Sequence, residues 1–216
     1  MMADGDTGAV PSEDEVRALV GEVVAALTGE GSGEQVTAPR PAPDVAGGQG
    51  PAGGVDGSGE DVAVGADHGG FHLKERIAAD LREHGFTVRD CGTGSTEPVD
   101  YPDFAHAVAR LVAGGECRWG IVVDGAGIGS AIAANKVPGI RAANCWDVSS
   151  ARNSREHNHA NVLTLGAGLL GESLALQVVQ AWLSTGWGEG RHARRVEKIT
   201  EIERRYLQDA PVRVSS

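Results

Sequence analysis

From residue 60 onward, short apolar runs alternate with longer segments whose apolar residues recur every three to four positions. The short runs predict buried strands, because a strand that is covered on both faces carries apolar side chains at consecutive positions. We expect strands at residues 61–66, 86–90, 119–124, 140–144 and 161–165. The longer segments predict helices at residues 71–84, 103–113, 129–136, 147–156, 171–184 and 191–207.

This alternation predicts an α/β fold: a three-layer, Rossmann-like domain with a parallel five-stranded sheet and helices on both faces. The domain spans residues 60–208, which is long enough to bury a full apolar core. In open sheets of this kind, ligands bind beyond the carboxyl ends of the strands. We therefore look for function in the turns that follow the first and third predicted strands.

The segment before the domain has a different pattern. Residues 12–28 predict an amphipathic helix, with Ser12 as N-cap and Glu15 completing a capping box. One face of this helix is apolar and consists of Val16, Leu19, Val20, Val23, Val24 and Leu27. Residues 29–59 are rich in glycine and proline and predict a flexible linker. Residues 1–11 and 209–216 are expected to be disordered.

Charge and cysteine content narrow the function classes. The net charge is −11, and residues 1–59 contribute −8 of it, with two arginines against ten acidic residues. The domain therefore lacks the basic excess of a nucleic-acid-binding surface. The three cysteines form no CxxC pair, which favours a reducing compartment. No secretory signal and no apolar run long enough for a membrane is visible, so we expect a cytoplasmic protein.

Two turns carry candidate chemistry. Asp124 ends the third predicted strand and begins the run DGAGIG, with glycines at 125, 127 and 129. Such a loop before a helix lets backbone N–H groups approach an anion, although a tight turn without a ligand has the same pattern. It is a poor dinucleotide fingerprint, because Ser130 stands where a third glycine is expected. Asp67 and His68 end the first predicted strand and are followed by two glycines.

Further along the chain, basic residues open the last predicted helix. Arg191 and Arg195 are four positions apart, so they share one helix face and could hold a phosphate. A helix that begins with solvent-exposed basic residues and binds no ligand has the same pattern. His157 and His159 form a close pair, but no carboxylate stands at helical ligand spacing. We therefore expect no metal.

Taken together, residues 61–207 resemble the family of type B ribose-5-phosphate isomerases and galactose-6-phosphate isomerase subunits. The stretches that carry the resemblance are GADHGGFHLKE, GTGSTEPVDYPDFA, GAGIGSAIAANKVPGIRAA, SREHNHANVLTLGA and GRHARRVEKITEIE. They cover nearly the whole domain in the order and spacing of the family.

The resemblance implies a Rossmann-like homodimer, or a tetramer built from it, with active sites at the subunit interface and no cofactor. It implies that His157 assists opening of the sugar ring and that Tyr101 borders the pocket. It also implies that Asn135 braces the glycine loop. The residues implied to contact the sugar phosphate are Asp67, His68, Asn158, Arg191 and Arg195, with the two arginines on the phosphate.

The sequence departs from the family at the positions of the catalytic base. Many members carry a cysteine as the C2 base where Asp124 stands, and others use a glutamate at the position of Ser130. We favour Asp124 as the base, assisted by Gly125, Gly127 and Gly129 as donors to the enediolate. The alternative is that Asp124 caps the next helix or accepts N–H groups of the loop.

The substrate stays open, because Ala126 replaces the threonine of the family. Ribose 5-phosphate is the first expectation, and galactose 6-phosphate, allose 6-phosphate or a tetrose phosphate are alternatives. The remaining possibility is a protein of another class, namely a non-catalytic sugar-phosphate-binding protein or an assembly protein.

The N-terminal segment resembles the encapsulation peptides that carry enzymes into bacterial microcompartments. This resemblance implies that residues 12–27 bind a shell protein or another cargo helix through the apolar face. The alternative is that the helix packs on its own domain or on the dimer partner. Membrane binding is disfavoured, because the polar face is acidic.

Overall fold

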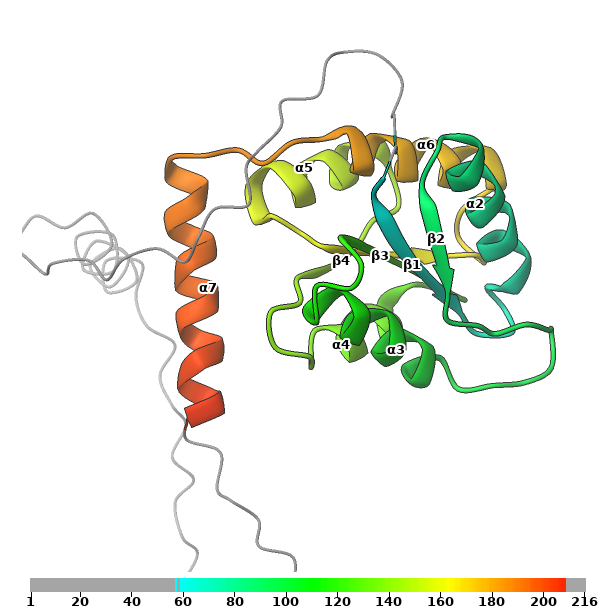
Figure 1. Ribbon diagram of the computed structural model, residues 1–216, viewed down its shortest axis with the longest axis horizontal. Helices are drawn as coiled ribbons and strands as arrows, with labels where there is room; N and C mark the ends of the chain where they lie inside the picture. Colours follow the sequence, from blue (N-terminus) through cyan, green and yellow to red (C-terminus); the bar gives the residue numbers. More distant parts are fainter. Residues whose placement is uncertain (1–56, 58, 209–216) are drawn as a thin grey trace, which may run out of the picture. The chain divides into compact units, whose positions relative to one another are not determined.

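The computed structural model describes residue 57 and residues 59–208 (Figure 1). The segments predicted at residues 1–11, 12–28 and 209–216, and nearly all of the linker, lie outside these residues. The domain contains a five-stranded sheet in the order β2-β1-β3-β5-β4, and all its strand pairs are parallel. The strands are β1 (Asp61–Ala66), β2 (Thr87–Asp90), β3 (Trp119–Asp124), β4 (Ala142–Asn144) and β5 (Val162–Gly166).

Helices cover both faces of this sheet, so the predicted three-layer α/β fold is confirmed (Figure 1). They are α2 (Phe71–Glu83), α3 (Tyr101–Ala113), α4 (Ile128–Ala134), α5 (Val148–Asn158), α6 (Glu172–Ser184) and α7 (Arg191–Gln208). Helices α2, α5 and α6 pack on one face, and α3 and α4 on the other.

The element boundaries differ from the predicted ones by one or two residues, and two of these differences have a clear cause. Helix α3 begins at Tyr101 rather than at residue 103, because Pro102 is tolerated in the first turn of a helix, where its missing N–H has no intrahelical partner. Strand β4 begins at Ala142 rather than at residue 140, because the N–H of Arg141 donates to the side chain of Asn161 (2.8 Å) instead of joining the ladder.

The direction of the connections explains where a ligand can bind. The chain leaves β1 toward β2 through α2, and it leaves β3 toward β4 on the opposite side through α4. Right-handed crossovers in opposite directions place these two helices on opposite faces. The carboxyl ends of β1 and β3 therefore flank a switch point, which is where ligands bind in open parallel sheets.

The apolar core fixes this arrangement. All six residues of β3 are buried, as expected for the central strand of a doubly covered sheet. At the α5 and α6 face, the rings of Trp119 and Trp182 meet edge to face, with centroids 5.4 Å apart. The buried guanidinium of Arg155 lies over both rings, 4.0 Å from that of Trp119 and 5.1 Å from that of Trp182. Each large apolar side chain buried in such a core stabilises the fold by about 1.5–3 kcal/mol.

The last helix differs from the others. None of the residues of α7 is buried, and its exposed apolar residues are Ile199, Ile202, Tyr206 and Leu207. It contacts α5, and the carboxylate of Glu203 accepts the N–H of Gly139 at 3.0 and 3.1 Å. Within the described part of the chain, no helix combines the length and the apolar character needed to cross a membrane.

Candidate active site

The turn after β1 presents Asp67 and His68 at the switch point. The N–H of Asp67 donates to the carbonyl of Val123 on β3 (3.2 Å), which ties the carboxyl ends of the two strands together. The carboxylate of Asp67 accepts the N–H of Gly70 (2.8 Å) and so closes the turn. Asp67 is half-buried and His68 is exposed, so both side chains can reach a ligand at this edge.

The loop after β2 completes the border of this region. Nδ1 of His68 lies 3.3 Å from both the carbonyl oxygen and the backbone nitrogen of Val99. Two residues later, Tyr101 begins α3, and its ring lies on the glycine loop. A Cβ on Gly129 would be 2.6 Å from the ring of Tyr101, so this ring lies directly against the glycine backbone. The structure therefore brings Asp67, His68 and Tyr101 together with the glycine loop.

Asp124 lies beneath this loop and is buried, with 4 % of its surface exposed. Its Oδ1 accepts the N–H groups of Ala126 (2.8 Å) and Gly127, and its Oδ2 accepts the N–H (3.0 Å) and the hydroxyl of Ser130. These four hydrogen bonds to one carboxylate fix the loop against the start of α4. This geometry is the loop-accepting one that the sequence offered as the alternative for Asp124.

The glycine loop is also held from β4 and β5. Gly127 has a positive φ of 78°, and a Cβ there would be 2.4 Å from Oδ1 of Asn144. The amide of Asn144 donates to the carbonyl of Ala126 (3.2 Å), and the hydroxyl of Thr164 donates to the carbonyl of Gly127 (2.8 Å). The loop is therefore rigid before any ligand arrives.

Asn135 does not brace the glycine loop, so that prediction is wrong. Its amide exchanges two hydrogen bonds with Ala142, one of 2.9 Å to the carbonyl and one of 2.8 Å from the N–H. The reason is its position after the last turn of α4, while the loop precedes the first turn. Asn135 therefore fixes the start of β4, and Asn144 provides the contact that was expected of it.

Two cysteines lie near the carboxyl ends of strands, but neither offers a thiolate. Burial raises the pKa of the Cys91 thiol, which follows β2, to about 11. Burial also raises the pKa of the Cys145 thiol, which follows β4. Both side chains stay protonated near neutral pH. At this edge of the sheet, the carboxylates of Asp67 and Asp124 and the ring of His68 remain as candidates for a base.

The other predicted residues lie at the opposite edge of the sheet. Helix α5 starts after the carboxyl end of β4 and ends before β5 begins, so His157 and Asn158 lie at the amino edge. The carbonyl of Glu156 accepts the N–H of Gly188 (2.9 Å), which brings the start of α7 to the same place. Arg191 and Arg195 are exposed there, and the ring of His192 stacks on that of His157 with centroids 4.2 Å apart.

The predicted site residues therefore form two groups within one chain. The carboxyl-edge group consists of Asp67, His68, Tyr101, Asp124 and the glycine loop, and the amino-edge group of His157, Asn158, Arg191 and Arg195. Strands of five to six residues separate the two edges by about 16–20 Å at ~3.3 Å per residue. A sugar phosphate cannot contact both groups of the same chain.

Sequence reasoning missed four residues that contact the predicted ones. Ser130 donates to Asp124 and Asn144 to the glycine loop, while Asn153 and His192 contact His157. The spacing of Asn153, four positions before His157 on a helix, is a signal that could have found it. The other three residues contact the predicted ones from different helices or strands. No sequence spacing marks them, because these contacts depend on how the elements pack.

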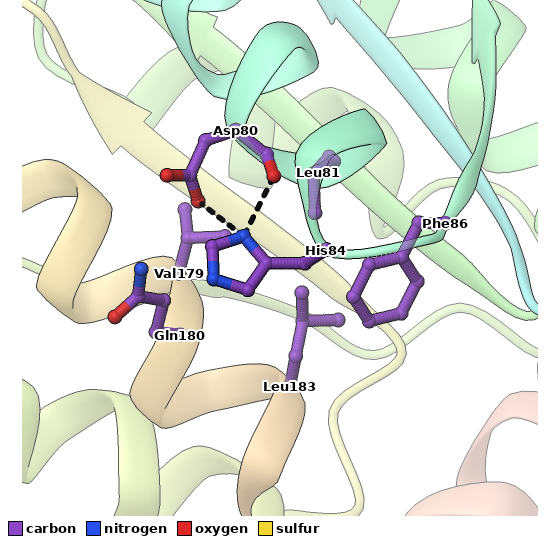
Figure 2. A pocket seen from close by; sticks show the side chains of 7 residues that line it. All are labelled: Asp80, Leu81, His84, Phe86, Val179, Gln180 and Leu183. Carbon is purple, nitrogen blue, oxygen red and sulfur yellow. Dashed lines mark hydrogen bonds and ion pairs between the residues drawn. The ribbon is translucent and has the colours of Figure 1, made fainter. Parts of the chain in front are cut away.

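A small hollow lies elsewhere, between the carboxyl-terminal ends of α2 and α6 (Figure 2). The ring of His84 lines it, with Nδ1 at 2.7 Å from the carbonyl oxygen of Asp80 and 3.5 Å from its carboxylate. The hollow is otherwise lined by Leu81, Phe86, Val179, Gln180 and Leu183, and none of the predicted site residues faces it.

Across residues 57 and 59–208, no three His, Cys, Asp or Glu side chains gather as a metal site.

Comparison with known proteins identifies relatives of the whole domain. The family model described as Ribose/Galactose Isomerase matches residues 62–199. Ribose-5-phosphate isomerase B of Escherichia coli (strain K12) is 51% identical over 144 residues, which are 67% of this chain and 97% of that protein. D-erythrulose-4-phosphate isomerase of Pectobacterium atrosepticum is 42% identical over 143 residues, which are 66% of this chain and 94% of that protein.

The fold is also similar to a solved structure. Ribose-5-phosphate isomerase B of Clostridium thermocellum has a TM-score of 0.67 and 53% sequence identity. The match covers 68% of this chain and 99% of that one. The part of the chain that the structure describes thus corresponds to nearly the full length of its relatives.

Proposed function

The chain belongs to the ribose/galactose isomerase family and is an aldose–ketose isomerase, and we propose that it converts ribose 5-phosphate to ribulose 5-phosphate. The observation that carries the proposal is the rigid glycine loop at the switch point, which faces Asp67 and His68 and lies over the carboxylate of Asp124. In this chemistry a base removes the proton from C2, an enediolate forms, and the same base returns the proton to C1.

We propose that Asp124 is this base. In support, it is a carboxylate directly beneath the loop, and the thiols after β2 and β4 are held protonated by burial. The loop supplies donors for the enediolate oxygens. The N–H groups of Ile128 and Gly129 belong to the first turn of α4, where no intrahelical acceptor exists, so they can donate to a developing anion.

The four hydrogen bonds to Asp124 also suit a residue that only holds the loop in place. An engaged carboxylate is a weak base unless one of its bonds yields when substrate binds. The bond from the hydroxyl of Ser130 can yield, because a hydroxyl rotates and the three backbone donors do not. In our proposal this bond breaks, and Oδ2 of Asp124 then accepts the C2 proton.

We propose further that the working enzyme is a homodimer in which the carboxyl-edge group of one chain meets the amino-edge group of the other. The separation of the two groups supports this, since a single chain cannot apply both to one substrate. The exposed apolar face of α7, with Ile199, Ile202 and Tyr206, supplies surface that a second copy can cover. Arg191 and Arg195 would then hold the phosphate, and His157 would assist ring opening.

A substrate panel tests the proposed reaction. Ribose 5-phosphate, galactose 6-phosphate, allose 6-phosphate and a tetrose phosphate are each assayed for isomerisation, and kcat/KM is compared. We expect ribose 5-phosphate to have the highest value. A higher value for the tetrose phosphate would favour the second candidate, which the relative named for D-erythrulose 4-phosphate suggests. Absence of turnover with all four would overturn the proposal in favour of a binding protein.

For the N-terminal segment we propose a targeting role. Residues 12–28 act as an encapsulation peptide that binds the enzyme to a microcompartment shell or cargo protein. The support is its amphipathic pattern and its separation from the domain by residues rich in glycine and proline. Residues 1–30 are fused to a fluorescent protein and expressed in cells that make such shells. Punctate fluorescence is expected, and diffuse fluorescence would contradict the proposal.

A further inference from the structure

Asn153 and His157 lie one turn apart on α5 and are joined by a hydrogen bond. Nδ2 of Asn153 lies 2.8 Å from Nδ1 of His157. The other end of the same amide agrees with this orientation, because Oδ1 of Asn153 faces Nδ2 of Asn158 at 3.5 Å. Asn153 thus presents its NH₂ group to His157. Since an NH₂ group can only donate, Nδ1 of His157 is the acceptor and carries no proton.

The proton of the neutral His157 ring is therefore on Nε2. Its surroundings agree with this assignment. Oε1 of Glu156 lies 3.8 Å from Nε2, too far for a hydrogen bond, but its negative charge favours a proton on the nearer nitrogen. The charged groups of α7 that act on the neighbouring ring of His192 include Arg191 and Arg195.

The ring of His192 fixes the plane of the His157 ring. The two rings are stacked with an interplanar angle of 4°. Burial lowers the pKa of His192, and the neighbouring His157, Arg191 and Arg195 lower it further. The lowered pKa of His192 favours a neutral ring on that side of the stack near neutral pH. One partner fixes the tautomer and the other fixes the plane.

We propose that Asn153 is a positioning residue, which holds His157 as a neutral Nε2–H donor aimed at the oxygen atoms of the sugar. This inference rests on the proposed function, in which His157 acts on the substrate during ring opening. Asn153 touches no reacting atom and acts only through His157. As a neutral donor, His157 keeps its Nε2 proton as the pH rises, so its contribution does not depend on an imidazolium.

The spectroscopic test compares the wild-type protein with Asn153→Asp. The aspartate side chain has the same shape as asparagine, but its carboxylate can only accept a hydrogen bond. It therefore requires a proton on Nδ1 of His157, which then donates to the carboxylate. The full-length protein is labelled with ¹⁵N-histidine, and the His157 signals are assigned by comparison with His157→Gln. We expect the Nε2–H tautomer in the wild type and a protonated Nδ1 in Asn153→Asp. A wild-type ring protonated on Nδ1 would overturn the proposal.

The kinetic test uses the pH dependence of kcat. In Asn153→Asp the ring of His157 loses its Nε2 proton as the pH rises. At the alkaline end of the pH profile, kcat is therefore expected to be about 10- to 100-fold lower than in the wild type, and KM should change by less than about threefold. The control is Arg152→Ala, an exposed neighbour on α5, which should keep the wild-type profile. An Asn153→Asp profile that matches the wild type would overturn the proposal.

The two tests separate this inference from the proposed function. The tautomer is measured in the ligand-free protein and does not depend on turnover. If the wild type isomerises none of the sugar phosphates, the proposed function fails, and the ¹⁵N spectra still decide the role of Asn153.

Discussion

The two edges of the sheet present their candidate residues in different ways. At the carboxyl edge, Asp124 is buried and receives four hydrogen bonds, and the glycine loop above it is held by Asn144 and Thr164. At the amino edge, Arg191 and Arg195 are long, exposed side chains on the first turns of α7. The first edge is held by hydrogen bonds within the single chain, whereas the two arginines of the second edge take their geometry from what binds there.

This difference indicates a division of labour. Stabilisation of an enediolate requires donors that are fixed before the reaction, and a loop of backbone N–H groups provides them. Recognition of a phosphate tolerates mobile side chains, because charge-assisted hydrogen bonds form over a range of geometries. The rigid edge suits the reacting carbons, and the exposed edge suits the remote phosphate. The predictions below test this division.

The largest effect is expected at Asp124. Asp124→Asn should lower kcat by about 10²- to 10⁴-fold, because the amide cannot take the C2 proton. Asp124→Cys should keep kcat within about tenfold of the wild type, because a thiolate can serve as the base. Steady-state kinetics on both variants, with circular dichroism to verify folding, provide the measurement. Equal losses in the two variants would assign Asp124 to holding the loop instead.

Mixing two inactive variants tests whether the two edges of different chains form one site. Asp124→Asn disables the carboxyl edge, and the double variant Arg191→Ala/Arg195→Ala disables the amino edge. Unfolded together at equal amounts and refolded, they should recover about a quarter of the wild-type activity, since half the dimers are mixed and each has one intact site of two. No recovery, despite mixed dimers detected by mass spectrometry, would show that each site belongs to one chain.

A third prediction concerns the loop that follows β2. Lys74 on α2 is buried, and its Nζ donates to both carboxylate oxygens of Asp90 (2.8 and 2.7 Å) and to the carbonyl of Thr93 (2.9 Å). Lys74→Met should lower the free energy of unfolding by about 2–3 kcal/mol, because these partners lose their donor. Urea unfolding measures the change.

The matched control for Lys74 is Arg76 on the same helix. It forms an ion pair with Glu172 (3.2 Å), in which the Arg76 side chain is 39% and the Glu172 side chain 62% exposed. Arg76→Met should therefore change the free energy of unfolding by less than about 1 kcal/mol. Equal changes in the two variants would mean that the buried network of Lys74 adds no more than a surface pair.

The smallest effect is a pH dependence of stability at the amino edge. Burial lowers the pKa of His159 to about 4, and the nearby Arg141 and Arg155 add to the effect. The unfolded chain, with an ordinary value near 6.5, binds the proton more readily than the folded one. Stability is therefore complete above pH 6.5 and declines as the pH falls toward 4, by about 1–2 kcal/mol after allowance for solvent screening.

His159→Asn isolates this contribution. His159 has a positive φ of 50° at the end of α5, a conformation that asparagine also accepts. Between pH 7 and pH 4.5, the free energy of unfolding should decline less in His159→Asn than in the wild type. The same decline in both proteins would mean that another group carries the dependence.

Much of the fold could be predicted from the sequence, because its signals are local. The five apolar runs predicted the five strands, and the carboxyl ends of the first and third of them indicated the turns at Asp67 and Asp124. Two boundary differences have identified causes, namely Pro102 in the first turn of α3 and the bond from Arg141 to the side chain of Asn161, which shortens β4. The contacts of Asn135, Asn144 and His192 could not be predicted, since each joins two different elements, and the local pattern does not specify how these elements pack.

The sequence by itself determined the layered fold and the position of the glycine loop, because periodicity and turn composition act over a few residues, and the candidate site residues came from the resemblance to the isomerase family. Only the tertiary structure decided how those residues are grouped. It buried Asp124 under four donors and separated the amino-edge residues from the carboxyl-edge ones. The physical reason is the parallel sheet: each crossover helix returns the chain to the amino edge, so residues at the two ends of one helix face opposite sides of the domain.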